Sequence, residues 1–141
     1  MTEVHVRETI DAPAARVWEM IGDFGGLARI GLVPSCTVEG EGIGAVRTLD
    51  MGGPVVRERL EAHDDAGRTL TYTMVETGPL PVRNYRSTIR VLEEGPQRCT
   101  IDWAGEFDPL GDAAEQAEQT VRGIYTGGIS GLRKALGLQA D

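Results

Sequence analysis

Between Cys36 and Phe107, short segments of alternating apolar and polar residues are separated by turns rich in glycine, proline and aspartate. A period of two residues is typical of β-strands with one buried face, and short turns favour antiparallel pairing. A further segment of this kind lies near the N-terminus. The expected strands are residues 4–10, 36–39, 45–50, 55–63, 68–76, 84–92 and 98–107. The chain therefore has to build its core around an antiparallel sheet.

Two other stretches have the three- and four-residue spacing of an amphipathic helix. In the first, Asp11 can cap a helix that has Pro13 in its first turn and ends near residue 23. Residues 24–30 form either a second short helix or a turn. The other stretch follows Asp112, a second candidate cap, and continues to about residue 136. Its apolar stripe consists of Ala117, Val121, Ile124, Gly128 and Leu132.

The long final helix can bury its apolar stripe only against the sheet. The predicted fold class is therefore α+β: a seven-stranded antiparallel sheet, two short helices between its first two strands, and a long C-terminal helix, in one domain spanning residues 1–141. The final helix contains Gly123, Gly127, Gly128 and Gly131, and each costs up to about 1 kcal/mol relative to alanine. These glycines indicate either close packing on the sheet or room for a ligand beneath the helix.

The composition argues against several partners. A net charge of −8 is unfavourable for binding nucleic acid or an anionic membrane. No stretch approaches the roughly 18 apolar residues of a membrane span, and the N-terminus lacks signal-peptide features, so we expect a cytoplasmic protein. His5 and His63 have no metal-binding spacing, His63 should be solvated, and we expect neither metal nor organic cofactor. Cys36 and Cys99 should be buried free thiols, with a disulfide or a reactive thiol as the alternative.

One charged side chain, Glu58, lies on the face of its strand that should point inward. The other residues on that face are Val56, Leu60 and Ala62. A buried charge is costly unless it is paired, hydrated or used. A symmetric hairpin turn at residues 51–54 would place Arg47 directly opposite Glu58, so the two are expected to meet.

The same alternation, applied to every strand, predicts an apolar chamber with few polar groups beneath the final helix. The candidate catalytic residues are Glu58, Tyr85 and Arg47. The candidate ligand-binding residues are Ser87, Tyr72, Trp103, Leu49, Met51, Met74, Phe107, Val121, Ile124 and Tyr125. Such a chamber suits a hydrophobic small molecule. A one-residue bulge would exchange the inward and outward residues of any strand.

Several polar residues of this chamber have both a structural and a functional interpretation. Arg47 and Glu58 form either an ion pair in the cavity wall or a site where Glu58 exchanges protons with a ligand. Burial would disfavour the charged carboxylate, whereas the arginine would favour it. The hydroxyls of Tyr85 and Ser87 either orient a ligand or only pack and bind water. Glu8, on the inward face near the end of the first strand, is expected to be solvated or to act as a cap.

The order of elements resembles that of the START-like, or SRPBCC, superfamily with its helix-grip fold. The motifs that carry the resemblance are Ile10-Asp11-Ala12-Pro13 with Val17-Trp18, Gly42-Ile43-Gly44-Ala45-Val46-Arg47, Glu58-Arg59-Leu60, Asn84-Tyr85-Arg86-Ser87, and Trp103 to Phe107. Each motif is short, but together they cover nearly the whole chain in the family's order. The resemblance is greatest to the bacterial polyketide cyclase/dehydrase-like branch. It implies a curved sheet wrapped around the final helix and an enclosed hydrophobic ligand.

The chain is also similar to plant abscisic acid receptors. Their gate loop corresponds to residues 51–54, and their latch loop corresponds to about residues 80–82. Leu80 and Pro81 replace the His-Arg pair of that latch, and Ile30 replaces the receptors' ligand-pairing lysine. These departures argue against that hormone as the ligand. The two loops can still form a mobile rim over the mouth of the pocket.

Two functions are consistent with these residues. The favoured one is an enzyme of secondary metabolism that cyclises or dehydrates a polyketide-like intermediate. In it Glu58 is the acid/base, Tyr85 and Ser87 orient the substrate, and Arg47 tunes the carboxylate. Both histidines face outward by the same alternation, which leaves no histidine base or nucleophilic triad. The other is a non-catalytic carrier or sensor of a hydrophobic small molecule. Either protein would be a monomer or a homodimer.

Overall fold

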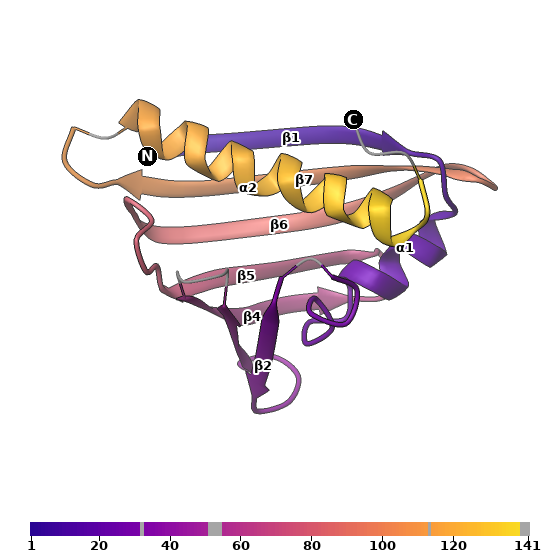
Figure 1. Cartoon of the computed structure of the whole chain (residues 1–141), viewed down its shortest axis with the longest axis horizontal. Coiled ribbons are helices and arrows are strands. Elements are labelled where there is room, and N and C mark those ends of the chain that lie inside the picture. Colours follow the sequence, from indigo (N-terminus) through magenta and orange to yellow (C-terminus); the bar gives the residue numbers. More distant parts are fainter. Residues whose placement is uncertain (32, 51–54, 113, 139–141) are drawn as a thin grey trace.

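The computed structural model describes residues 1–31, 33–50, 55–112 and 114–138. Within these residues a curved antiparallel sheet carries two helices (Figure 1). The elements in chain order are β1 (Thr2–Ile10), α1 (Ala14–Ile21), β2 (Ser35–Glu39), β3 (Val46–Asp50), β4 (Val55–Asp64), β5 (Thr69–Glu76), β6 (Val82–Gly95), β7 (Arg98–Pro109) and α2 (Ala114–Ala135). The α+β helix-grip fold is therefore confirmed.

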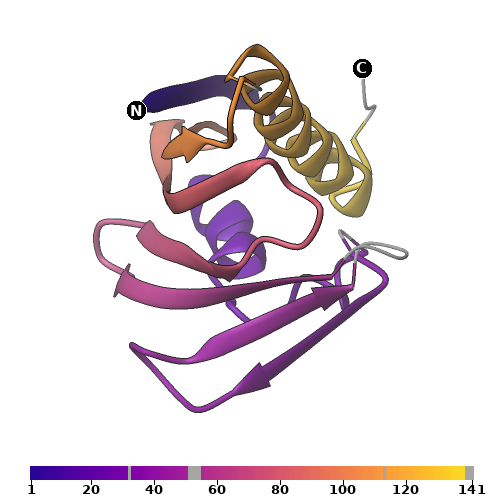
Figure 2. The same cartoon turned by 90° about the vertical axis from the view of Figure 1, so that its left-hand side faces the viewer.

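All neighbouring strands pair antiparallel, in the order β1-β7-β6-β5-β4-β3-β2. Each expected strand is present, and its ends differ from the prediction by three residues or fewer. The inward faces alternate as expected along β3, β5, β6 and β7, where Leu49, Tyr72, Ile89 and Ile101 are buried. The sheet thus has one concave apolar face, and both helices lie on it (Figure 2).

The segment between β1 and β2 differs from the prediction in two ways. Helix α1 begins after Pro13, which makes no side-chain cap hydrogen bond, so the proposed Asp11 cap is wrong. Asp11 instead lies 3.4 Å from Arg98 on the surface. The second short helix is replaced by successive turns over residues 23–31. Gly25 and Gly26 explain this, because adjacent glycines disfavour a helix.

Helix α2 packs along one side of the sheet, against β1 and β7. Its buried side chains recur every three or four residues and are Ala117, Val121, Tyr125, Ile129 and Leu132. Near its C-terminal end, Arg133 donates hydrogen bonds to Glu8 (2.6 Å) and to the Thr9 carbonyl oxygen (2.8 Å). Glu8 is partly exposed, but it is not a cap: it pairs with Arg133 and holds α2 on β1. The strands from β5 to β2 curl away from the helix (Figure 2).

A bulge in β4 overturns two further predictions. The register with β5 shifts between Leu60 and Ala62, so alternation changes sign at that point. Ala62, expected to face inward, is exposed. His63, expected to be solvated, is half-buried: its Nε2 donates to the Gly22 carbonyl oxygen at 2.8 Å, and its ring lies 5.2 Å from that of Trp18. His63 therefore holds the end of α1 against the sheet.

Candidate functional site

A cavity of about 400 Å³ lies between α2 and the strands that curl away from it. It exists because α2 packs on β1 and β7, at one side of the sheet, and leaves the concave face of the other strands uncovered. Most of its wall is apolar. Its described lining residues are Leu27, Val33, Arg47, Leu49, Val56, Glu58, Tyr72, Met74, Pro79, Leu80, Tyr85, Trp103, Thr120, Gly123, Ile124, Gly127 and Gly128. This size and lining are typical of a small-molecule site.

The glycines of α2 serve two different purposes. A Cβ atom added at Gly128 would lie 3.1 Å from the Trp103 ring, so this glycine lets the helix approach β7. A Cβ atom added at Gly123 or Gly127 would meet no heavy atom within 4 Å, and both residues line the cavity. Both interpretations of the glycines therefore hold, each at different positions: Gly128 permits close packing, whereas Gly123 and Gly127 leave space.

Arg47 and Glu58 form a buried ion pair in the cavity wall. The register of β3 and β4 places them opposite each other, as predicted. The Arg47 Nε and Nη2 atoms lie 2.8 and 2.7 Å from the Glu58 Oε1 atom, and the two residues are only 4 and 5% exposed. The Arg47 Nη1 atom donates to the Phe24 carbonyl oxygen at 3.1 Å. The rings of Phe24 and Tyr72 flank the guanidinium at 4.3 and 5.1 Å.

The second carboxylate oxygen of Glu58, Oε2, does not take part in the contacts with Arg47. Oε2 accepts no hydrogen bond from any residue in the described part of the chain. No side chain in that part has an unpaired polar atom sealed away from solvent. Since Glu58 lines the cavity, its Oε2 atom therefore borders the cavity. The wall thus presents a hydrogen-bond acceptor within an apolar surface.

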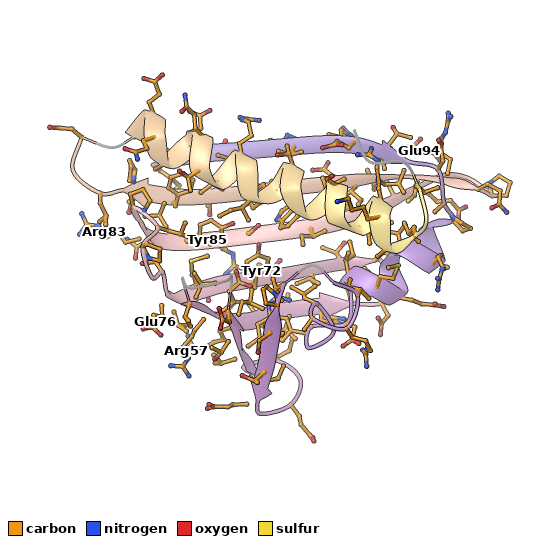
Figure 3. The ribbon with its side chains drawn as sticks, viewed as in Figure 1. Arg57, Tyr72, Glu76, Arg83, Tyr85 and Glu94 are labelled. Carbon is orange, nitrogen blue, oxygen red and sulfur yellow. The ribbon has the colours of Figure 1, made fainter. Side chains whose placement is uncertain are left out.

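A second polar group joins the sheet to α2. The Tyr85 and Tyr125 hydroxyls are hydrogen-bonded to each other, and the Ser87 Oγ atom lies 3.0 Å from the Tyr125 hydroxyl. The Trp103 Nε1 atom donates to Ser87 Oγ at 2.9 Å, and the Trp103 ring stacks on Tyr125 with 4.3 Å between ring centroids. Tyr85 and Trp103 line the cavity, but their polar atoms are engaged in this network. Tyr72 lies beside Tyr85, with ring centroids 6.1 Å apart (Figure 3).

The structure brings most of the candidate residues together. Those that line the cavity are Glu58, Tyr85, Arg47, Tyr72, Trp103, Leu49, Met74 and Ile124. Four others lie behind the wall, in the core where α2 packs on the sheet: Ser87, Phe107, Val121 and Tyr125. Met51, together with the loop at residues 51–54, lies outside the described residues. The placement of the described residues is consistent with a ligand site, and their roles stay predictions.

Sequence reasoning missed one side of the cavity. Leu27 and Val33 come from the turns before β2, where no periodic pattern exists to indicate which side chains point inward. Pro79 and Leu80 come from the β5–β6 loop, and its correspondence to a latch loop indicated a position at the pocket rim. Thr120 lies one helical turn before Ile124, so helical spacing alone could have identified it.

Burial raises the pKa of every tyrosine in the chain, and the sequence contains three. The pKa values of Tyr72 and Tyr85 lie well above the ordinary value, chiefly because of burial, with nearby negative charge on Glu58 contributing. Burial raises the pKa of Tyr125 to about 12. All three are neutral phenols at physiological pH, so none is a base. Among the described lining residues only Arg47 and Glu58 carry charge.

These pKa values predict a steep loss of stability at alkaline pH. A raised pKa in the folded state stabilises the protein fully below the unfolded value of about 10, and this stability disappears as the pH rises through the folded value. For Tyr125, a rise from 10 to about 12 corresponds to about 3 kcal/mol. We expect phenolate absorbance to appear together with loss of circular dichroism above pH 10. Phenolate forming at pH 10 in a protein with native dichroism would contradict the burial of these tyrosines.

The described residues form no metal-type cluster and no helix that could span a membrane. No three histidine, cysteine, aspartate or glutamate side chains gather there as a metal ion would require. Neither described helix is long and apolar enough to cross a membrane. Cys36 is half-buried and Cys99 is buried, and both are free thiols as expected. Burial raises the pKa of each thiol, which makes it less reactive.

The family follows from comparison with known sequences. The family model described as polyketide cyclase / dehydrase and lipid transport matches residues 1–137. The chain belongs to this family. The assignment also confirms the resemblance to the SRPBCC superfamily, and it agrees with a fold built around a ligand cavity. A search of the curated proteins finds no match.

Solved structures of this fold include bacterial and plant proteins. An uncharacterized protein from Bacillus thuringiensis is 33% identical, with 95% of this chain and 98% of that chain covered and a TM-score of 0.87. The protein XoxI from Bacillus cereus is also 33% identical, with coverage of 96 and 95% and the same TM-score of 0.87. Norcoclaurine synthase from Thalictrum flavum, solved with dopamine and hydroxybenzaldehyde, is 20% identical, with coverage of 96 and 86% and a TM-score of 0.77. At that identity the plant enzyme supports the fold alone.

Proposed function

We propose that the protein binds a hydrophobic small molecule beneath α2 and catalyses its cyclisation or dehydration, with Glu58 as the proton acceptor. The observation that carries this proposal is the Glu58 Oε2 atom, an acceptor without a protein partner among the described residues in an otherwise apolar wall. A carboxylate oxygen that borders the cavity can reach a proton of a bound ligand. Membership of the polyketide cyclase / dehydrase family supports the same chemistry.

The proposed chemistry needs one base and a fixed substrate shape. The Glu58 carboxylate, held in place by Arg47, accepts a proton from a carbon next to a ligand carbonyl. The resulting enolate carbon then attacks a second carbonyl of the same molecule, which closes a ring, and the alkoxide formed on that carbonyl oxygen takes the proton back from Glu58. In a dehydration, the protonated Glu58 instead returns the proton to a departing hydroxyl, and water leaves as the double bond forms. The apolar wall holds the reacting atoms near each other, which lowers the entropic part of the barrier.

A direct test is conversion of the compound that co-purifies with the protein, identified by native mass spectrometry. Wild-type protein should convert this compound, whereas Glu58→Gln should lose turnover, because an amide does not accept the proton. Glutamine keeps the shape and can still accept the Arg47 hydrogen bonds, so binding should be weakened but not lost. Glu61→Gln is the matched control, since Glu61 bonds to Thr73 on the outer face of the sheet at 2.6 Å. Full activity in Glu58→Gln would exclude Glu58 as the base.

A cavity variant tests binding without touching the ion pair. Gly127→Leu places a large side chain where no heavy atom lies within 4 Å of the Cβ position, so it should fill the cavity. Leucine also has a helix propensity up to about 1 kcal/mol better than glycine, so the fold should not be weakened. Loss of both ligand binding and turnover, with unchanged or higher thermal stability, is the expected result. Unchanged binding would place the ligand elsewhere.

The second candidate function is a non-catalytic carrier or sensor. It is favoured by the fact that most polar groups at the cavity already have partners. The Arg47 donors are used by Glu58 and Phe24, and the Tyr85 hydroxyl is used by Tyr125. Release of the co-purified compound unchanged after incubation with wild-type protein would support this function. Release of a different compound would exclude it.

A further inference from the structure

Of the two charged groups in the described cavity wall, one is paired and the other can still meet a ligand. Each guanidinium nitrogen of Arg47 already has an acceptor: Nε and Nη2 contact Glu58 Oε1, and Nη1 contacts the Phe24 carbonyl oxygen. The rings of Phe24 and Tyr72 flank the guanidinium. The positive charge of Arg47 is therefore paired within the wall, with one N–H group of each nitrogen engaged. What remains for a ligand is the negative partner, through Glu58 Oε2.

We propose that the cavity takes neutral apolar compounds that carry a hydroxyl group, with this hydroxyl donating to Glu58 Oε2, and that it rejects carboxylates such as fatty acids. This inference rests on the proposed ligand-binding function and does not require catalysis. A ligand carboxylate would face a carboxylate oxygen in an apolar cavity, with no unused cation among the described lining residues. It would lose its hydration without gaining a partner, and like charges repel strongly in such surroundings.

The neutral polar groups of the wall do not change this expectation. Tyr72 remains a neutral phenol because burial keeps its pKa high, and Trp103 donates its N–H to Ser87. Thr120 contributes a neutral hydroxyl from α2. Neutral groups can hydrogen-bond a ligand, but they cannot offset a full negative charge removed from water. Selection between an alcohol and an acid therefore depends on the Arg47–Glu58 pair.

Three probes with the same ring system separate the effects of charge and hydrogen bonding: 2-naphthol, 2-methoxynaphthalene and 2-naphthoate. Their two fused rings suit a cavity of about 400 Å³. By isothermal titration calorimetry at neutral pH, 2-naphthol should bind at least about tenfold more tightly than 2-methoxynaphthalene, which lacks the donor. The methyl ether should in turn bind more tightly than 2-naphthoate, because only the acid introduces a charge.

Variants of the ion pair then test the assignment to Glu58. In Glu58→Gln, the amide oxygen can keep the contact with Arg47, which turns the amide N–H groups toward the cavity. The preference should therefore reverse, with 2-naphthoate gaining affinity and 2-naphthol losing it. Glu61→Gln should keep the wild-type order. Arg47→Leu/Glu58→Leu, which replaces the pair with apolar side chains, should bind 2-naphthol and its methyl ether equally, and circular dichroism checks that each variant is folded.

The outcomes separate the two proposals. Equal binding of all three probes by the wild-type protein, or tighter binding of 2-naphthoate, overturns the selectivity and leaves ligand binding intact. An unchanged order of affinities in a folded Glu58→Gln variant also overturns the role of Glu58. Failure of all three probes to bind, with wild type and Gly127→Leu indistinguishable, overturns both the selectivity and the proposed binding function.

Discussion

Replacing Arg47 by methionine should destabilise the protein by about 3–5 kcal/mol, because it leaves the Glu58 carboxylate buried without its partner. Glu58 is 5% exposed, and both of its close polar contacts come from Arg47. The variant also leaves the Phe24 carbonyl oxygen without the Nη1 donor. The shift of the urea unfolding midpoint measures the effect. A loss of this size is a large part of the stability of a small domain, so the variant should unfold at moderate temperature.

Two matched variants identify the cause of that loss. Arg59→Met, one residue from Glu58 on β4 but on the exposed face, should change stability by no more than about 0.5 kcal/mol. Arg47→Met/Glu58→Leu removes both charges and should return close to wild-type stability, since replacing a buried ion pair with apolar side chains is often neutral. If the double variant were as unstable as Arg47→Met, lost packing rather than an unpaired charge would be responsible.

Gly105→Ala should destabilise the protein by about 3 kcal/mol through a single methyl group. A Cβ atom at this position of β7 would lie 2.0 Å from the Tyr125 hydroxyl oxygen and 3.2 Å from its Cζ atom. Tyr125 cannot retreat easily, because it is fully buried and its ring is stacked on Trp103. Either the tyrosine shifts and breaks its hydrogen bonds to Tyr85 and Ser87, or α2 moves away from the sheet.

A double-mutant cycle with Tyr125→Phe isolates this contact. Alone, Tyr125→Phe removes the hydroxyl and its hydrogen bonds, a loss of about 1 kcal/mol per bond. In Gly105→Ala/Tyr125→Phe the closest clash is gone, so the double variant should be more stable than the sum of the single effects predicts. Gly95→Ala is the control, because a Cβ atom there meets nothing within 4 Å. Strict additivity of the two effects would show that the clash is relieved elsewhere.

The ion pair could be predicted from the sequence because strand alternation and hairpin symmetry are local rules. Alternation indicated that Glu58 points inward, and counting across the hairpin placed Arg47 opposite it, as the register of β3 and β4 confirms. The same rules failed a few residues later in β4, where the register with β5 shifts between Leu60 and Ala62. Nothing in the composition of residues 60–63 marks a bulge, so Ala62 and His63 were assigned to the wrong faces.

Strand β6 also contains an irregularity, but the predicted inward position of Tyr85 is correct there. Asn84 has a positive φ of 54°, and the register with β7 shifts between Arg83 and Arg86. Asparagine tolerates this left-handed conformation better than most residues do. The bulge allows both Val82 and Tyr85 to point inward, although simple alternation would separate them. The inward position of Tyr85 agrees with the prediction because Tyr85 keeps the alternation of the buried residues that follow it, Ser87, Ile89 and Val91.

The part of the cavity wall that loops contribute could not be predicted from the periodicity of the sequence. Leu27 and Val33 point into the cavity from a segment of turns, where no period relates one side chain to the next. The depth of the cavity also depends on how far α2 stands from the sheet. That distance is set by packing at Gly105 and Gly128, which only three-dimensional contacts reveal.

The one-sided attachment of α2 separates the residues that hold the fold from those that meet a ligand. The helix is fixed to β1 and β7 by its buried stripe and by the Arg133 contacts to Glu8 and Thr9. The open side is lined from β3, β4 and β5, whose inward residues do not hold the helix in place. Outside the Arg47–Glu58 pair, substitutions there can reshape the chamber at less cost in folding than substitutions beneath the helix, so one scaffold can acquire new ligands by few mutations.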